Sequence, residues 1–269
     1  MNLFLFSLII TFLYSPILHA ENIIIGGSGS DLATFKLLTD KFQQTHPETT
    51  FKILPSIGSG GGIKAIKSGR IDLCLISRTP KEKEKSDDII FTNYAQTPFL
   101  FTVNKGLKLN NLSTQNILDI YSGKMTHWNA ETQVKLILRP SNDSDTLILS
   151  DKVTGFKNIM NQAYKRRGLP IASTDQETID LIGRLKGGIG TTSLSLIKTE
   201  AHNIKPVKLD GIDPSPANIA NGKYKLFKDL HMCHNNKNIT TELMRFINFV
   251  HSKDGREILN KTGHNIVNF

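Results

Sequence analysis

Strand-like and helix-like segments alternate over the first hundred residues, and this order constrains the fold more than any other feature of the chain. Leu32, Phe35, Leu38 and Phe42 recur at the spacing of one helical face. A second, shorter helix-like segment ends at Gly69. The segments around these helices are expected to be strands at 22–27, 50–55 and 71–77. Strands that alternate with helices predict βαβ units and an α/β fold, and the fully apolar run at 71–77 is typical of a parallel sheet.

A second set of alternating segments follows the first. Ser113 is expected to cap a helix that runs through Ser122 and is ended by Gly123. One long helix is expected from about 144 to 166, and residues 211–222 are expected to be a loop because Gly, Pro and Asn dominate them. The remaining segments are expected to be strands at 99–104, 134–140, 187–193 and 204–209, and helices at 174–185 and within 240–263.

The first twenty residues differ in composition from the rest of the 269-residue chain. They are apolar and uncharged, and their apolar core of about a dozen residues is shorter than a membrane span requires. This pattern predicts a cleaved secretory signal peptide at 1–20. A retained N-terminal anchor is the alternative, because the segment lacks a leading Lys or Arg and has Leu18 where a small residue is preferred.

The charge of the chain indicates what it attracts. The net charge is +9, and a positive excess of this size favours anionic partners. The Lys and Arg residues are dispersed, and no basic block is interleaved with aromatic residues, so a small anion fits better than nucleic acid.

The two cysteines do not form a disulfide framework. Cys74 lies in an apolar run and is interpreted as a buried small hydrophobe. Cys233 lies between His231 and His234, but side chains of one strand point alternately to its two faces, so a metal site there is not expected.

Three junctions between a strand and a helix carry small polar residues, at 26–31, 58–62 and 139–146. The start of a helix presents unpaired N–H groups and the positive end of its dipole. Small residues let an anion reach those groups, Ser hydroxyls add donors, and Arg139 adds a forked cationic group. A single junction of this kind can be only a capped helix behind a tight turn, but three in one chain favour an anion site.

Common motifs for nucleotides and for hydrolysis are not completed. The segment "GSGGGIK" has Ile63 before its Lys, so it is not a P-loop, and neither glycine loop gives G-x-G-x-x-G. No G-x-S-x-G elbow surrounds a Ser. We therefore expect no cofactor and no enzymatic activity, and an enzyme or nucleotide-binding domain that uses the same anion pockets is the alternative.

Taken together, these segments resemble the periplasmic phosphate-binding proteins of bacterial phosphate ABC transporters. The resemblance extends over nearly all of the chain after residue 20, and the segments that carry it are "GGSGSD", "SIGSGGGIKAIKSGRIDLCLISR", "YSGKMTHWN", "RPSNDSDT", "GGIGTTS" and "RFINFVHSKDGREILNKTG". It implies a type II periplasmic binding protein fold with an anion in a cleft between two α/β lobes. Lobe 1 would be 22–96 plus 225–269 and lobe 2 would be 97–224, with hinge crossings at 94–101 and 221–230.

The resemblance also implies which residues bind the anion. Ser59 matches the serine of the family's second glycine loop, and Ser28 and Ser30 straddle the position in the first loop. Arg139 matches the anion-clamping arginine. The residues expected to bind the ligand are Ser28, Gly29, Ser30, Ser59, Gly60, Ser77, Arg139, Ser144, Asp145 and Thr146.

Two positions depart from the family's pattern. The family's Ser-Gly-Thr is here Ser144-Asp145-Thr146, and the aspartate of well-known members corresponds to Ser77. Such an aspartate can accept the proton that phosphate carries and sulfate lacks, whereas it repels a fully ionised oxyanion. We hypothesise that Asp145 or Asp143 replaces it; the alternative is that Asp145 points outward and only caps a helix.

The resemblance predicts a periplasmic, non-enzymatic protein that captures a tetrahedral oxyanion, most simply phosphate, for uptake. Its partners would be an ABC permease and ATPase, so it would meet the membrane only through them. A periplasmic phosphate sensor or adhesion-related binder that is not coupled to transport is the alternative with the same fold.

Overall fold

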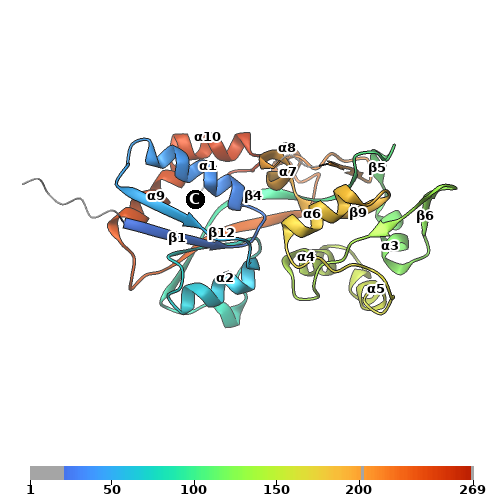
Figure 1. Cartoon of the computed structure of the whole chain (residues 1–269), viewed down its shortest axis with the longest axis horizontal. Helices are drawn as coiled ribbons and strands as arrows, with labels where there is room; N and C mark the ends of the chain where they lie inside the picture. The colour runs from blue at the N-terminus through green and yellow to red at the C-terminus, as the bar shows by residue number, and fades with distance from the viewer. Residues whose placement is uncertain (1–20, 201–202, 268–269) are drawn as a thin grey trace, which may run out of the picture.

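The computed structural model describes residues 21–200 and 203–267, so the signal peptide expected at 1–20 lies outside the described residues. Its main element is one mixed sheet of eight strands in the order β2-β1-β3-β12-β4-β9-β8, with β10 paired to β4 (Figure 1). The strands of this sheet are β1 (Glu21–Gly27), β2 (Thr49–Ile53), β3 (Leu73–Ile76), β4 (Ile89–Asn104), β8 (Lys135–Leu136), β9 (Gly188–Ser193), β10 (Ile204–Pro206) and β12 (Phe227–Asn235).

The sheet begins as a parallel βαβ arrangement and then changes direction. β1 is parallel to both β2 and β3, as expected. β12 is antiparallel to β3 and also to β4, along which it pairs from Phe227 opposite Pro98 to Asn235 opposite Ile89, with a register shift between Leu230 and His231. The parallel sheet expected around 71–77 is confirmed on the β1 side of β3, whereas its other neighbour, β12 from near the C-terminus, is antiparallel.

The helices lie on both faces of this sheet. In Figure 1, α1, α9 and α10 lie on one side of the first strands and α2 lies on the other. The helices are α1 (Leu32–Gln43), α2 (Gly58–Lys67), α3 (Thr114–Ser122), α4 (Ser144–Lys152), α5 (Phe156–Ala163), α6 (Asp175–Arg184), α7 (Leu194–Thr199), α8 (Pro216–Ala220), α9 (Thr241–His251) and α10 (Lys253–Lys261), with a 3-10 turn η1 (Glu82–Glu84). Within 21–200 and 203–267, no helix combines the length and the apolar character needed to cross a membrane.

Two main apolar cores divide the molecule into two lobes. One core takes its buried residues from 23–95 and 230–259, and the other takes them from 99–226. β4 contributes to both cores, since Tyr94 and Ala95 belong to the first and Phe99 and Phe101 to the second. The fold is that of a type II periplasmic binding protein, while the residue boundaries of the lobes stay a prediction.

Several expected elements are confirmed. Ser113 caps α3, accepting a hydrogen bond from the Asn116 amide at 3.0 Å, and Gly123 ends this helix with φ 82°. The helix starts at 26–31, 58–62 and 139–146 are also present, as the beginnings of α1, α2 and α4. Cys74 and Cys233 are buried free thiols opposite each other on β3 and β12.

Other elements differ from the expectation. The single helix expected at 144–166 is two helices, because Gly155 takes a left-handed conformation with φ 79° and starts α5 in a new direction. The strand expected at 134–140 shortens to β8, and the one expected at 204–209 divides into β10 and β11 (Lys208–Leu209), which pairs with β5 (Asn111–Leu112) instead. The loop expected at 211–222 contains α8, where Ser215 caps a turn that begins with Pro216. The remaining strands, β6 (His127–Asn129) and β7 (Thr132–Gln133), form a separate hairpin.

Candidate functional site

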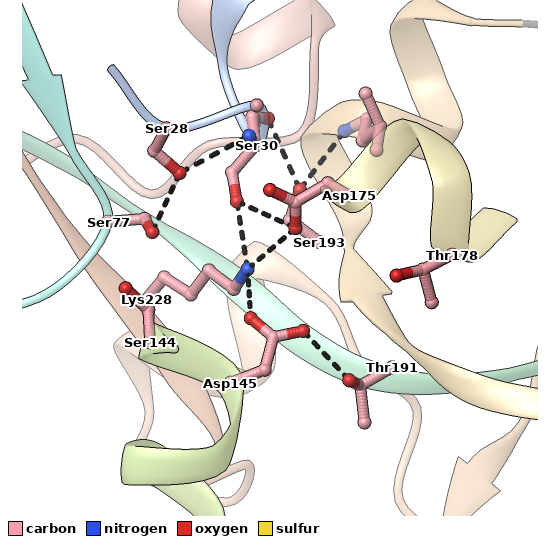
Figure 2. A network of polar contacts seen from close by, with 12 residues as sticks. Ser28, Ser30, Ser77, Ser144, Asp145, Asp175, Thr178, Thr191, Ser193 and Lys228 are labelled. Atoms are coloured by element: carbon pink, nitrogen blue, oxygen red, sulfur yellow. Dashed lines mark hydrogen bonds and ion pairs between the residues drawn. The ribbon is translucent and has the colours of Figure 1, made fainter. Parts of the chain in front are cut away.

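Four serine hydroxyls from four different segments meet near the centre of the molecule. Ser28, just before α1, donates to the Ser77 hydroxyl at the end of β3, at 2.9 Å. Ser59, in the first turn of α2, lies 3.4 Å from Ser77 and 3.1 Å from Ser144, which begins α4. All four side chains are buried. We call Ser28, Ser59, Ser77 and Ser144 the serine cluster; Figure 2 shows three of its members.

The glycines of these junctions allow close approach. A Cβ on Gly27, where φ is 136°, would lie 2.1 Å from the Leu75 carbonyl oxygen, and one on Gly62 would lie 2.8 Å from Cys74 Sγ. A Cβ on Gly29 would lie 2.4 Å from Gln176 Oε1, so this glycine brings the first loop against α6. Gly60 faces open space, with nothing within 4 Å of such a Cβ. Close packing therefore requires glycine at 27, 29 and 62, whereas Gly60 borders open space and a side chain there would meet no neighbour.

Arg139 is buried behind the start of α4. Its Nε and Nη2 donate to the Asp143 carboxylate at 3.1 and 2.9 Å, and its Nη1 donates to the Ala172 carbonyl and the Thr178 hydroxyl. Burial alone would lower the pKa of the guanidinium, but Asp175 and then Asp145 and Asp143 hold it above its ordinary value. Arg139 is thus a buried charge whose guanidinium is already engaged by its own neighbours.

Thr146 contacts the backbone of Arg139 and the side chain of Tyr164. Its hydroxyl lies 3.4 Å from the Arg139 carbonyl oxygen, to which it donates, and 3.4 Å from the Tyr164 hydroxyl. Within the described residues these contacts hold the start of α4 against the segment before it, and Thr146 makes no hydrogen bond to the serine cluster.

Lys228 is the largest omission of the sequence-based site. It lies on β12, is 1% exposed, and points among three side chains from distant segments (Figure 2). Its Nζ lies 2.5 Å from Asp145 Oδ1 and 3.3 Å from Asp175 Oδ1, and it donates to the Ser30 hydroxyl at 2.8 Å. Burial opposes its charge, but Asp145 and then Asp175 raise its pKa above the ordinary value for lysine. Lys228 is therefore a buried lysine whose charged form is favoured by the two carboxylates beside it.

Asp145 points inward. It is 1% exposed and accepts a hydrogen bond from the Thr191 hydroxyl at 2.8 Å, in addition to its ion pair with Lys228. The side chain that caps α4 is Asp143, which accepts from the Asp145 amide at 3.0 Å. The alternative in which Asp145 points outward and only caps a helix is therefore wrong.

Two cations face three carboxylates at this site. Burial and the nearby Asp145 raise the pKa of Asp143 above its ordinary value. Burial would do the same to Asp175, but Lys228 and then Arg139 lower its pKa below the ordinary value. A fully ionised cluster is negative by one unit, so a further anion is accepted more easily when it brings a proton with it.

The glycine loop at 26–31, before α1, is hydrogen-bonded to residues of α6, β9 and α7. Ser195 and Ser193 donate to the Ser30 carbonyl oxygen at 2.9 and 3.3 Å, and Gln176 Nε2 donates to the Gly29 carbonyl oxygen at 3.1 Å. The expected residues Gly29 and Ser30 therefore contact α6, β9 and α7, which the sequence-based site did not include.

Within 21–200 and 203–267, no group of three or more His, Cys, Asp or Glu side chains is arranged to hold a metal ion.

Comparison with known proteins places this geometry in a family. A family model for the PBP superfamily domain matches residues 18–254. The phosphate-binding protein PstS of Borreliella burgdorferi is 21% identical over 77% of this chain and 76% of its own length, and PstS of Bacillus subtilis is 20% identical over 87% and 76%. A solved structure from Clostridium perfringens, assigned as a phosphate ABC transporter substrate-binding protein and holding phosphate, is 23% identical with a TM-score of 0.81, covering 92% of this chain and all of its own. The chain belongs to the PBP superfamily.

Proposed function

We propose that the chain captures orthophosphate at the serine cluster, between its two lobes, and presents it for uptake by an ABC transporter. The observation that carries the proposal is the meeting of four serine hydroxyls from the starts of α1, α2 and α4 and the end of β3, beside two buried cations. The relatives named as phosphate-binding proteins support the choice of ligand.

Binding uses the hydroxyls that now contact each other. An oxyanion between Ser59 and Ser144 would replace their mutual contact with two hydrogen bonds to charged oxygens, each of which contributes about 1.5–3 kcal/mol. A micromolar site requires about 8 kcal/mol, so a small number of such bonds is sufficient once the costs of lobe closure are met. Because Ser59 and Ser144 belong to different lobes in the predicted division, the anion would favour the closed arrangement of the lobes.

Selection between phosphate and sulfate would follow from the carboxylates. Asp145 is held by Lys228 and Thr191, and Asp143 is held by Arg139, so the excess negative charge belongs to the cluster rather than to one free aspartate. Phosphate can arrive protonated at neutral pH and donate a hydrogen bond, whereas sulfate cannot. In well-known members of the family that the sequence resembles, an aspartate stands at the position of Ser77. We propose that the net negative charge of this cluster, to which Asp145 contributes, takes over the role of that aspartate.

The proposed location is the periplasm, reached through cleavage of residues 1–20. The proposed transport partners are an ABC permease and ATPase, to which the chain would deliver its ligand without chemical change. These proposals rest on the resemblance and on the names of the relatives rather than on a docking surface.

Calorimetry on protein stripped of bound anion tests the proposal. Phosphate and arsenate are expected to bind at micromolar concentration, and sulfate and molybdate much more weakly. Ser59→Ala is expected to weaken phosphate at least about tenfold, because it removes a donor that faces both Ser77 and Ser144. Ser68→Ala is the matched control, since that exposed serine follows the last residue of the same helix and its hydroxyl donates to the Ala65 carbonyl, away from the serine cluster. No phosphate heat, or equal losses in both variants, would exclude the proposed site.

A further inference from the structure

A groove lies directly outside the serine cluster, between the start of α2 and the start of α4. Both helices lie on the same side of the molecule (Figure 1). The groove has a volume of about 550 Å³ and includes Ser59 and Ser144 in its lining. This volume is many times that of a single orthophosphate ion, so the groove has room for a larger ligand.

The lining of this groove is strongly cationic. Arg78 and four lysines contribute to it, namely Lys64, Lys67, Lys81 and Lys83. The two carboxylates in the lining are already paired, Glu84 with Arg78 at 2.7 Å and Asp143 with Arg139 at 2.9 Å. Among the described residues, none of the four lysines forms an ion pair, so their charge is available to a ligand.

The shape of the groove favours a narrow, charged guest. Gly58 and Gly60 leave one side without side chains, and a Cβ at either would meet nothing within 4 Å. The α2 segment therefore offers backbone and lysine charge, and Ile57 and Ile63 are the main apolar side chains in the lining. A peptide or a lipid tail would find little surface to bury here.

We propose that this groove, which shares Ser59 and Ser144 with the serine cluster, extends the anion site outward and binds a linear condensed phosphate. A chain of linked phosphates can contact several of the lysines at once, whereas one exposed lysine contributes little to the binding of a single ion. The lysines come from α2 and from the segment around η1, so they lie on two walls of the groove. The inference goes beyond the proposed function, because none of these lysines belongs to the serine cluster.

Calorimetry with tripolyphosphate at low ionic strength tests the groove on the full chain. The test variant changes Lys64, Lys67 and Lys83 to Gln. The matched control changes three exposed lysines elsewhere to Gln, namely Lys108, Lys157 and Lys165, and so has the same net charge. Orthophosphate is titrated in parallel as the ligand of the serine cluster, and ATP as a phosphate chain carried on a nucleotide.

The groove variant is expected to bind tripolyphosphate at least about tenfold more weakly than the control, while its orthophosphate affinity stays within about twofold of the control. The same loss with ATP would extend the site to nucleotides, and a loss with tripolyphosphate alone would restrict it to free chains; both support the groove. The inference is overturned if tripolyphosphate does not bind the wild-type chain, or if the groove and control variants weaken it equally. If orthophosphate fails to bind any variant while the groove still discriminates, the proposed function fails and the lysine-lined groove stands as a site for condensed phosphate.

Discussion

Lys228→Met is the most informative single change, because it removes one buried cation and leaves its partners in place. Lys228 Nζ faces Asp145 at 2.5 Å, Asp175 at 3.3 Å and the Ser30 hydroxyl at 2.8 Å, and the side chain is 1% exposed. Removing one partner of a buried ion pair typically costs about 3–5 kcal/mol, since the remaining charge is left uncompensated. Two carboxylates are left here, so we expect a loss of this size in the free energy of unfolding.

Urea denaturation, followed by circular dichroism and by the fluorescence of Trp128, measures this loss. Trp128 is the only tryptophan, and its Nε1 donates to the Gly187 carbonyl at 2.9 Å. Lys225→Met is the matched control, because that lysine is exposed on the same segment and should change the stability by no more than about 0.5 kcal/mol.

A second variant separates charge from packing. In the double variant Lys228→Met with Asp145→Asn, the nearest carboxylate is neutralised, so we expect the double variant to be more stable than Lys228→Met alone. A cost below about 1 kcal/mol for Lys228→Met, or a double variant no more stable than the single one, would refute the reasoning.

Three further predictions concern single residues. Asp145→Asn is expected to let sulfate compete at least about tenfold better against phosphate, because one repelling carboxylate is removed; calorimetric competition measures this, and unchanged competition contradicts it. Asp175 has a lowered pKa in the folded chain, so the stability it contributes is present above its unfolded pKa and is lost as the pH falls through the folded value. Urea midpoints below about pH 4 should therefore fall more steeply for the wild type than for Asp175→Asn, and parallel curves would contradict this. Gly62→Ala should destabilise the chain, since its Cβ would lie 2.8 Å from Cys74 Sγ, whereas Gly60→Ala in the same helix should stabilise it by up to about 1 kcal/mol in thermal denaturation. Equal shifts for the two alanines would contradict the packing argument.

The positions of the helix starts could be predicted because short-range chemistry sets them. Ser113 and Gly123 bound α3 as expected, the small residues at 26–31 precede α1, and those at 58–62 form the first residues of α2. These features depend on caps, turns and apolar spacing within about a dozen residues. The division of 144–166 into two helices depends on the left-handed conformation of Gly155, which a helix-like apolar pattern does not reveal.

The membership of the site was only partly predictable, because it depends on strand order. Lys228 lies between Phe227 and Asp229 in a strand whose next two alternating buried positions, Leu230 and Met232, are apolar. A lysine at that alternating position was a signal that it is buried, but nothing local indicates that its neighbours are Asp145 and Asp175. Those neighbours follow from the position of β12 between β3 and β4 in the sheet. This strand order depends on contacts between residues far apart in the sequence.

The continuous ladder between β4 and β12 has a mechanical consequence. Both strands pass through the region where the two cores meet, and their hydrogen bonds run without a loop from Pro98 to Ile89, with one register shift at Leu230. Opening of the lobes would therefore bend a double-stranded ribbon, and the register shift is a local irregularity in its pairing. A paired ribbon resists bending away from its equilibrium conformation. The stiffness of this pairing, together with the affinity for the bound anion, would therefore set the rate at which the anion is released.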